Sequence, residues 1–190
     1  MPRLIITGPP NIGKTTLVNS VVKKLSNNNK NVIGFVTNEI RSEGSRIGFQ
    51  LQNLSDFNDK TNLASLTSSL PEVSRRKLPT VSKYSIHVSE FEDFYRNIFF
   101  STSSSSSPSS ANQSKILVID EIGKMELFSK SFVKDVTNLI KNNENCILVV
   151  AQKGPGFINK IKEFKEIDQV ITINFQNRNL LCDEVVDKFV

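Results

Sequence analysis

The residues best suited to chemistry form one segment near the N-terminus, Gly8-Pro9-Pro10-Asn11-Ile12-Gly13-Lys14-Thr15-Thr16. Residues 8–15 satisfy every fixed position of G-x-x-x-x-G-K-[ST], the phosphate-binding loop. Gly8 and Gly13 lack a Cβ where backbone N–H groups must converge on a phosphate chain. Lys14 begins a predicted helix, from which its ammonium can reach the β- and γ-phosphates. The Thr15 hydroxyl stands where Mg²⁺ would bind, so the segment predicts a nucleoside triphosphate as ligand.

The elements on both sides of this segment decide between a phosphate loop and its alternative, a glycine-rich turn that caps a helix beside a solvated lysine. Residues 3–7 form an apolar run, and residues 16–22 have the apolar periodicity of a helix. This strand–loop–helix order is the context that the motif requires. We therefore assign residues 8–16, Thr16 included, to nucleotide binding.

A second site with acidic residues follows the apolar run 115–119. Asp120 ends this predicted strand, at the edge where open α/β sheets bind their ligands, and it fits the residue that holds Mg²⁺. Taken alone the pattern is weak, because Asp often ends a buried strand as a turn or cap residue. The phosphate loop makes it specific. Glu121 follows directly, and regular strand alternation would point its side chain away from that of Asp120.

The other elements predict an α/β fold of the P-loop type, a three-layer α/β/α sandwich with a mainly parallel sheet. Residues 31–41 and 46–54 favour two strands joined by a turn, which would add an antiparallel hairpin to that sheet. Residues 55–80 lack periodicity, and we expect a long loop with one helical turn. The apolar runs 146–151 and 170–173 predict two further strands.

Residues 83–88 favour a strand followed by a helix, for which Ser89 is the expected N-cap and Glu92 the capping-box residue. This helix would bury its aromatic stripe. The low-complexity segment 101–114 is rich in serine and should be a flexible insertion loop. Because ordered elements of one domain flank it, it does not mark a domain boundary.

Composition indicates one globular domain spanning residues 1–190, with 38% hydrophobic and 23% charged residues. No apolar run is long enough to cross a membrane, and the first residues lead straight into a predicted strand. We therefore expect a cytoplasmic protein with no membrane partner. The net charge of +5 is scattered in pairs and triplets, so nucleic acid is a possible partner but not a required one. The sequence does not fix the oligomeric state, and a monomer is the working expectation.

Longer motifs carry a resemblance to one family. They are the loop Gly-Pro-Pro-x-x-Gly-Lys-Thr-Thr, then Gly34-Phe35-x-Thr37-x-Glu39-x-Arg41, Gly44-x-Arg46-x-Gly48-Phe49, Asp120-Glu121-Ile122-Gly123-Lys124-Met125-Glu126-Leu127-Phe128-Ser129 and Asn177-Arg178-Asn179-x-Leu181. Together they resemble the cancer-related nucleoside-triphosphatase family. The likeness covers almost the whole chain apart from residues 55–80 and the Ser-rich segment, and the block from Asp120 is its most specific part.

The resemblance implies a Mg²⁺-dependent hydrolase that releases the terminal phosphate of ATP, GTP, CTP and UTP slowly and with little base preference. It also implies that Glu121 orients the attacking water, as a glutamate at this place does in one large division of P-loop NTPases. Lys124 is a candidate for a positive charge near the γ-phosphate. Arg46 and Arg178 are candidates for contacts with the base, ribose or phosphates. For each of these three cations the alternative is a salt bridge or a helix-end contact.

Two other functions use the same loop. A small nucleoside or nucleotide kinase would add a mobile arginine-rich lid, for which Arg75-Arg76-Lys77 is the candidate. A nucleotide-dependent switch or RNA-associated binding module would use slow hydrolysis to reset itself, and the net positive charge favours it.

Overall fold

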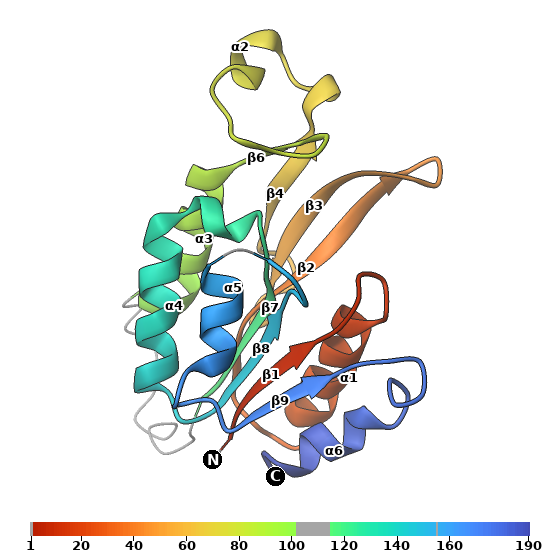
Figure 1. Cartoon of the computed structure of the whole chain (residues 1–190), viewed down its shortest axis with the longest axis vertical. Helices are drawn as coiled ribbons and strands as arrows, with labels where there is room; N and C mark the ends of the chain where they lie inside the picture. The colour runs from red at the N-terminus through yellow and green to blue at the C-terminus, as the bar shows by residue number, and fades with distance from the viewer. Residues whose placement is uncertain (1, 102–114, 155) are drawn as a thin grey trace.

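A computed structural model describes residues 2–101, 115–154 and 156–190. In this part of the chain, nine strands form one sheet in the order β5-β6-β4-β3-β2-β7-β8-β1-β9 (Figure 1). The strands are β1 (Arg3–Thr7), β2 (Val32–Ser42), β3 (Ser45–Asn53), β4 (Lys60–Leu66), β5 (Thr80–Val81), β6 (Tyr84–Ile86), β7 (Ile116–Ile122), β8 (Cys146–Val150) and β9 (Gln169–Thr172). The helices are α1 (Lys14–Asn27), α2 (Glu72–Arg75), α3 (Val88–Phe100), α4 (Lys130–Asn142), α5 (Phe157–Lys160) and α6 (Leu181–Asp187), with 3₁₀ turns η1 (Thr67–Ser69), η3 (Glu126–Phe128) and η4 (Ile161–Glu163). The predicted insertion 101–114 lies outside the described residues, except for Ser101.

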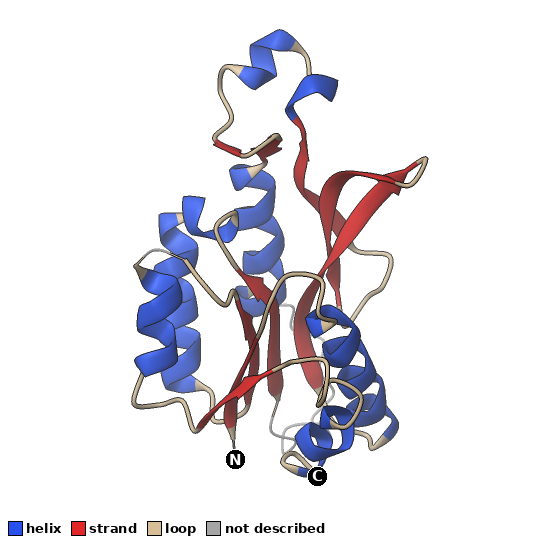
Figure 2. Ribbon diagram, turned by 45° about the vertical axis from the view of Figure 1, so that its right-hand side comes forward, coloured by secondary structure: helices blue, strands red, loops and turns tan. Residues whose placement is uncertain are grey.

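The predicted three-layer arrangement is confirmed. Strands β2, β7, β8, β1 and β9 lie side by side in this order and run parallel to one another. Helices α1 and α6 contribute to the hydrophobic core on one face of the sheet, and α3 and α4 contribute to the core on the other (Figure 2). Residues of β1 alternate between these two cores, with Leu4 and Ile6 in one and Ile5 in the other. The parallel strands are therefore covered on both faces, which explains their continuous apolar runs.

The predicted antiparallel hairpin is also confirmed, as strands β2 and β3. Glu43 and Gly44 form the turn between them, with φ angles of 48° and 78°. Positive φ at both central residues is typical of the turns that match the twist of a hairpin. In Figure 1 the two strands project beyond the parallel part of the sheet and form an arm above its carboxyl edge.

The prediction of a long loop over residues 55–80 is wrong in part, because this segment contains strand β4 and short helical turns. Strand β4 lies between β3 and β6 and pairs antiparallel with both. Its sequence, Lys-Thr-Asn-Leu-Ala-Ser-Leu, has no alternation, and only Leu63 and Ala64 are fully buried. The backbone hydrogen bonds that the two neighbouring strands offer determine this strand, and no local pattern shows them.

The predicted capping box at the start of α3 is wrong. The helix begins at Val88, with His87 as its N-cap and no side-chain hydrogen bond to the first turn. The carboxylate of Glu92 instead accepts hydrogen bonds from the hydroxyls of Ser129 and Ser131, at 2.5 and 2.6 Å. Glu92 therefore ties α3 to the start of α4. The predicted burial of the aromatic stripe is confirmed for Phe91, Phe94 and Tyr95.

None of the helices among the described residues has the length and apolar character that crossing a membrane requires.

Candidate active site

The phosphate loop joins the carboxyl end of β1 to the N-terminus of α1. Asn11 and Gly13 have φ angles of 62° and 107°, in the left-handed region that glycine and asparagine tolerate best. At Gly8, a Cβ would lie 2.8 Å from the backbone oxygen of Ile173, so this glycine lets the loop pack against the residue that follows β9. Asn11, Gly13 and Gly8 thus stand at the positions where the loop backbone requires a positive φ angle or a close approach.

The side chain of Lys14 lies within this loop and is only 8% exposed. Its ammonium donates hydrogen bonds to the backbone oxygens of Gly8 and Pro9, at 3.3 and 3.1 Å. A cation buried against neutral carbonyls is well placed to bind an anion that enters the loop, because the carbonyls hold it in place without neutralising its charge.

Asp120 lies on β7, next to the phosphate loop. The strand does not end at Asp120, as expected, but continues to Ile122, with a register shift between Ile119 and Ile122 against β8. A bulge of this kind redirects side chains and interrupts the regular alternation that the sequence implied. The Asp120–Glu121 peptide bond within it is cis.

The carboxylate of Asp120 is completely buried, and neither of its oxygens has a hydrogen-bond partner within the part of the chain that the structure describes. Burial raises its pKa to about 7, and the charge of Glu121 adds to the rise. The Thr15 hydroxyl and the Lys14 ammonium lower this pKa, although the hydroxyl is not in hydrogen-bonding geometry. A buried carboxylate without a partner, close to a threonine hydroxyl, is the donor set that a hard divalent cation would satisfy.

Glu121 is half-buried, and burial raises its pKa while the charge of Lys14 opposes the rise. Thr37 lies in the middle of the neighbouring strand β2, just beyond the part that pairs with β7, and it binds both polar groups of the Asp120–Glu121 peptide. Its hydroxyl donates to the Asp120 carbonyl at 2.5 Å and accepts from the Glu121 N–H at 3.2 Å. Sequence analysis gave Thr37 no role. The only signal in the sequence was a threonine within a predicted strand, and its role becomes clear only when β2 and β7 are known to be neighbours.

Glu126 is a buried acidic residue within the sequence block 120–129. Its carboxyl group is 4% exposed and accepts a hydrogen bond from the Gly123 N–H at 2.9 Å. Burial raises the pKa of Glu126 to about 8, and the nearby Glu121 contributes to the rise. A Cβ at Gly123 would lie 3.2 Å from a Glu126 oxygen and 3.7 Å from a Glu121 oxygen, so both carboxyl groups border this glycine. The turn that follows β7 therefore brings the carboxyl group of Glu126 close to that of Glu121.

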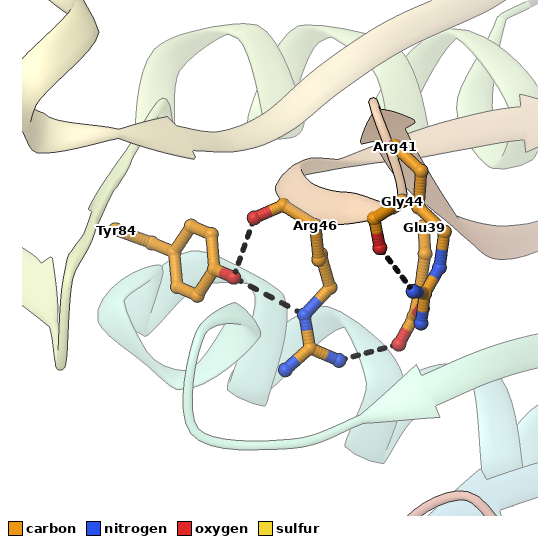
Figure 3. A network of polar contacts seen from close by, with 5 residues as sticks. All are labelled: Glu39, Arg41, Gly44, Arg46 and Tyr84. Carbon is orange, nitrogen blue, oxygen red and sulfur yellow. Dashed lines mark hydrogen bonds and ion pairs between the residues drawn. The ribbon is translucent and has the colours of Figure 1, made fainter.

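The hairpin carries a network of charged side chains, drawn in Figure 3. Glu39 pairs with Arg46 through one carboxylate oxygen and with Arg41 through the other, the latter at 2.5 Å. Arg46 also donates to the Tyr84 hydroxyl at 3.1 Å, and Arg41 donates to the Gly44 carbonyl at 3.1 Å. Partial burial alone would raise the pKa of Glu39, but the hydrogen bonds from Arg46 and Arg41 lower it below its ordinary value. Two guanidinium groups share one carboxylate, so the network carries a net positive charge.

These elements enclose a cleft of about 770 Å³. One side, which we call the phosphate wall, is formed by Gly8, Pro10, Asn11, Gly13, Lys14, Thr15 and Thr16. The opposite side, the hairpin wall, is formed by Thr37, Asn38, Glu39, Arg41, Arg46 and Phe49. Glu121, Ala151, Gln152 and Lys153 complete the lining. A cleft at the carboxyl edge of a parallel sheet, with a phosphate loop on one side and arginines on the other, is suited to a polyphosphate.

Comparison with known proteins decides the family. The family model described as "NTPase" matches residues 3–186. Nucleoside-triphosphatase THEP1 of Thermococcus kodakarensis is 34% identical over 188 residues, with 98% of this chain and 93% of that protein covered. The human cancer-related nucleoside-triphosphatase is 32% identical over 187 residues, with 96% and 94% covered. The chain belongs to the nucleoside-triphosphatase family. This membership confirms the family and the enzyme class that the motifs predicted.

A solved structure of the nucleoside-triphosphatase family agrees with the fold. The solution structure of a human cancer-related nucleoside triphosphatase superposes with a TM-score of 0.77 at 30% identity, covering 100% of this chain and 97% of that chain. The similarity therefore extends over the phosphate loop, the hairpin and the last helix together.

The structure does not bring every candidate residue of this nucleoside-triphosphatase into the cleft. Lys124 is exposed and is not among the cleft-lining residues. Arg178 lies on the outer side of the phosphate loop, in a second and smaller hollow. Arg75 donates to the backbone oxygens of Leu70 and Ser68, away from the cleft lining.

Proposed function

We propose that this protein hydrolyses nucleoside 5'-triphosphates to the diphosphate and phosphate, with Mg²⁺ as cofactor and water as the nucleophile. The observation that carries this proposal is that Lys14 and the half-buried Glu121 line one cleft, with Asp120 buried beside them and without a hydrogen-bond partner among the described residues. Positioning and charge stabilisation would supply most of the rate enhancement, as in phosphoryl transfer generally.

Thr15 and Asp120 are the residues that would hold Mg²⁺. The buried, unpartnered carboxylate of Asp120 fits this assignment, because leaving an acceptor buried without a partner is costly unless a ligand satisfies it. When bound, the cation supplies charge neutralisation on the phosphate oxygens.

The protein's own groups act on the phosphates and on the water. The phosphate loop and Lys14 bind the triphosphate through backbone N–H groups and a charge, and Glu121 orients the attacking water and accepts its proton. Thr37 fixes the Glu121 backbone through the hydrogen bonds described above. Arg46 lines the same cleft, as Arg41 does, and could stabilise charge on the phosphates only after leaving Glu39, whereas Lys124 would have to approach from an exposed position.

We also propose slow turnover on ATP, GTP, CTP and UTP alike. Slow turnover is supported by the pairing of both hairpin arginines with Glu39, because a guanidinium bound to a carboxylate is not free to stabilise charge on a transferring phosphoryl group.

The test is phosphate release from the four triphosphates with and without Mg²⁺, for the native protein, Lys14→Ala and Glu121→Gln. We expect Mg²⁺-dependent release from all four. Glu121→Gln should bind nucleotide but lose about 10²–10⁴ in rate, the range typical of acid–base assistance. Lys14→Ala should lose at least about 100-fold. A Glu121→Gln variant with the native rate would exclude the water-orienting role.

The same assay separates the alternatives. Phosphorylated product after addition of nucleosides or nucleoside monophosphates would indicate a kinase. Salt-sensitive RNA binding that differs between ATP and ADP would indicate a switch.

A further inference from the structure

A second hollow, of about 350 Å³, adjoins the cleft on the outer side of the phosphate loop. Gly13 and Thr16 line both spaces, so the hollow continues directly from the site proposed for the phosphates. Its other polar borders include Ser20 on α1 and Arg178 and Asn179 after β9. A nucleotide whose phosphates lie in the loop can therefore extend its nucleoside part into this hollow without crossing the hairpin wall.

An aromatic ring with a stacked cation stands beside this hollow. Phe175 is 77% exposed, and the guanidinium carbon of Arg178 lies 5.1 Å from the centre of its ring. An exposed phenylalanine contributes little to the stability of the fold. Its open face and the planar guanidinium are, however, both surfaces on which a heterocyclic base can stack. No other contact of this ring with an aromatic group is present among the described residues.

Asparagine side chains hold the loop that carries Phe175 and Arg178. The Asn174 carboxamide oxygen accepts from the backbone N–H groups of Gln176 and Asn177, at 2.8 and 3.0 Å. Asn177 accepts from the Asn174 N–H at 2.8 Å and donates to the Thr172 carbonyl at 2.9 Å. The close approach of Gly8 to Ile173 joins the start of this loop to the phosphate loop. The platform is thus preorganised, which reduces the entropic cost of binding.

The hairpin wall offers a competing aromatic residue, Phe49, with Arg46 at 5.0 Å from its ring centre. This pair is already engaged, because Tyr84 packs edge-on against Phe49 at 5.3 Å and Glu39 binds Arg46. Among the described residues, the Phe175–Arg178 pair has neither a second aromatic contact nor an ion pair of this kind, so it is the more open surface. We infer that Phe175 and Arg178 form the stacking platform for the nucleobase of the triphosphate, with the base in the hollow between Thr16 and Asn179. This inference rests on the proposed function and specifies how that site takes its substrate.

Base preference follows from this platform. Stacking uses the flat face that every base has, whereas discrimination needs hydrogen bonds to the base edge. Among the described residues, the polar side chains that border the hollow are those of Thr16, Ser20, Arg178 and Asn179, and none of them is a carboxylate. Purines and pyrimidines are therefore both accepted, and purines bind more tightly because they offer a larger stacking area.

The first experiment compares equilibrium binding of ATP with that of inorganic tripolyphosphate, which lacks the base and ribose. The variants are Phe175→Ala and Arg178→Lys, since lysine keeps the charge but loses the planar group. Each should weaken ATP binding about tenfold and leave tripolyphosphate binding unchanged. The matched control is Phe57→Ala, which removes an exposed phenylalanine (62% exposed) that lines neither space.

Equal loss of ATP and tripolyphosphate binding, or no loss of either, would overturn the inference. Failure of the proposed function looks different, because the native protein would then bind neither compound or would release no phosphate. If Phe175→Ala changes self-association instead, the ring belongs to a contact between copies of the chain.

A second variant provides a direct signal. The chain contains no tryptophan, so Phe175→Trp introduces a unique fluorophore at the platform. ATP should change its fluorescence and tripolyphosphate should not, whereas Phe57→Trp should respond to neither. A Phe175→Trp protein that binds ATP by equilibrium dialysis without any change in fluorescence excludes base stacking at this residue.

Discussion

The two walls of the cleft differ in what fixes their side chains. In the phosphate wall, backbone geometry and burial hold Lys14, which is 8% exposed, and the neighbouring Asp120 is fully buried. In the hairpin wall, ion pairs among partly exposed groups hold the side chains, with Arg41 57% exposed and Glu39 30% exposed. Buried groups in a fixed backbone stay in place whether or not a ligand is bound, whereas exposed ion pairs contribute about 0–1 kcal/mol and exchange readily.

This difference suggests a division of labour. The phosphate wall is preformed and provides the binding energy, and it adjoins the acidic residues Asp120 and Glu121 of β7. The hairpin wall holds two positive charges through a carboxylate that an incoming phosphate can replace. The predictions below test this contrast, from its most rigid member to its most exchangeable one.

The position that should tolerate a side chain least is Gly34 on β2, the first strand of the hairpin. A Cβ there would lie 1.8 Å from the backbone oxygen of Val118 on β7, and its φ of 136° disfavours other residues. We expect Gly34→Ala to lower the free energy of unfolding by more than about 3 kcal/mol or to prevent folding. Gly44→Ala, in the hairpin turn with open space around it, should cost only about 1 kcal/mol. Chemical denaturation of both variants makes the comparison, and equal costs would refute it.

The buried Glu126 predicts a pH-dependent stability. Its pKa is about 8 in the folded protein, above the ordinary value of 4.5, with Glu121 and Asp120 contributing their charges. Below about pH 4.5 both states hold the proton. Between this value and about pH 8 the unfolded state releases it while the folded state keeps it, so stability falls by at most about 1.4 kcal/mol per pH unit. Above about pH 8 this loss is complete.

Glu126→Gln removes this titration and keeps an oxygen that can accept from the Gly123 N–H. Relative to the native protein, the variant should therefore gain stability as the pH rises from about 5 to about 8. Denaturant titrations across this range measure the difference. A constant difference would mean that Glu126 is ionised in the folded protein.

The sequence predicted the phosphate wall well, because the chemistry of that wall is local. Gly8, Gly13 and Asn11 determine the backbone of the loop, and Lys14 follows from its place at the start of α1. The hairpin was also predictable, from its alternation and its turn residues. In both cases, residues close in the sequence supply the physical cause.

Features that depend on neighbouring strands were not predictable. Strand β4 exists because β3 and β6 offer it hydrogen bonds, and Thr37 acquires its role because β2 pairs with β7. The bulge at Asp120 and Glu121 also depends on the register against β8. Asp120 and Glu121 could be proposed as site residues without this information. The direction of their side chains could not be predicted without it.

Thr37 connects the hairpin wall to the acidic residues, since it lies on strand β2 and holds the Asp120–Glu121 backbone. Thr37→Val keeps the shape of the side chain and removes the hydroxyl. We expect the rate of phosphate release to fall about tenfold with unchanged nucleotide binding, because a small displacement of the group that orients water is costly. The matched control is Thr137→Val on α4, whose hydroxyl donates to the Val133 carbonyl at 2.8 Å and which is not among the residues that line the cleft. Parallel loss of rate in both variants would indicate a general effect on stability.

The smallest effect should come from Glu39, in the exchangeable network. Glu39→Gln removes the charge that pairs with Arg41 and Arg46, while stability should change by no more than about 1 kcal/mol. Both guanidinium groups then become available to the triphosphate, and binding of a non-hydrolysable ATP analogue should tighten by about fivefold at low salt and less at high salt. Glu43→Gln, which removes an exposed carboxylate from the turn of the same hairpin, is the control for general charge effects. If Glu39→Gln instead weakens binding, Glu39 is needed to hold the arginines in the cleft, and the hairpin wall is as preformed as the phosphate wall.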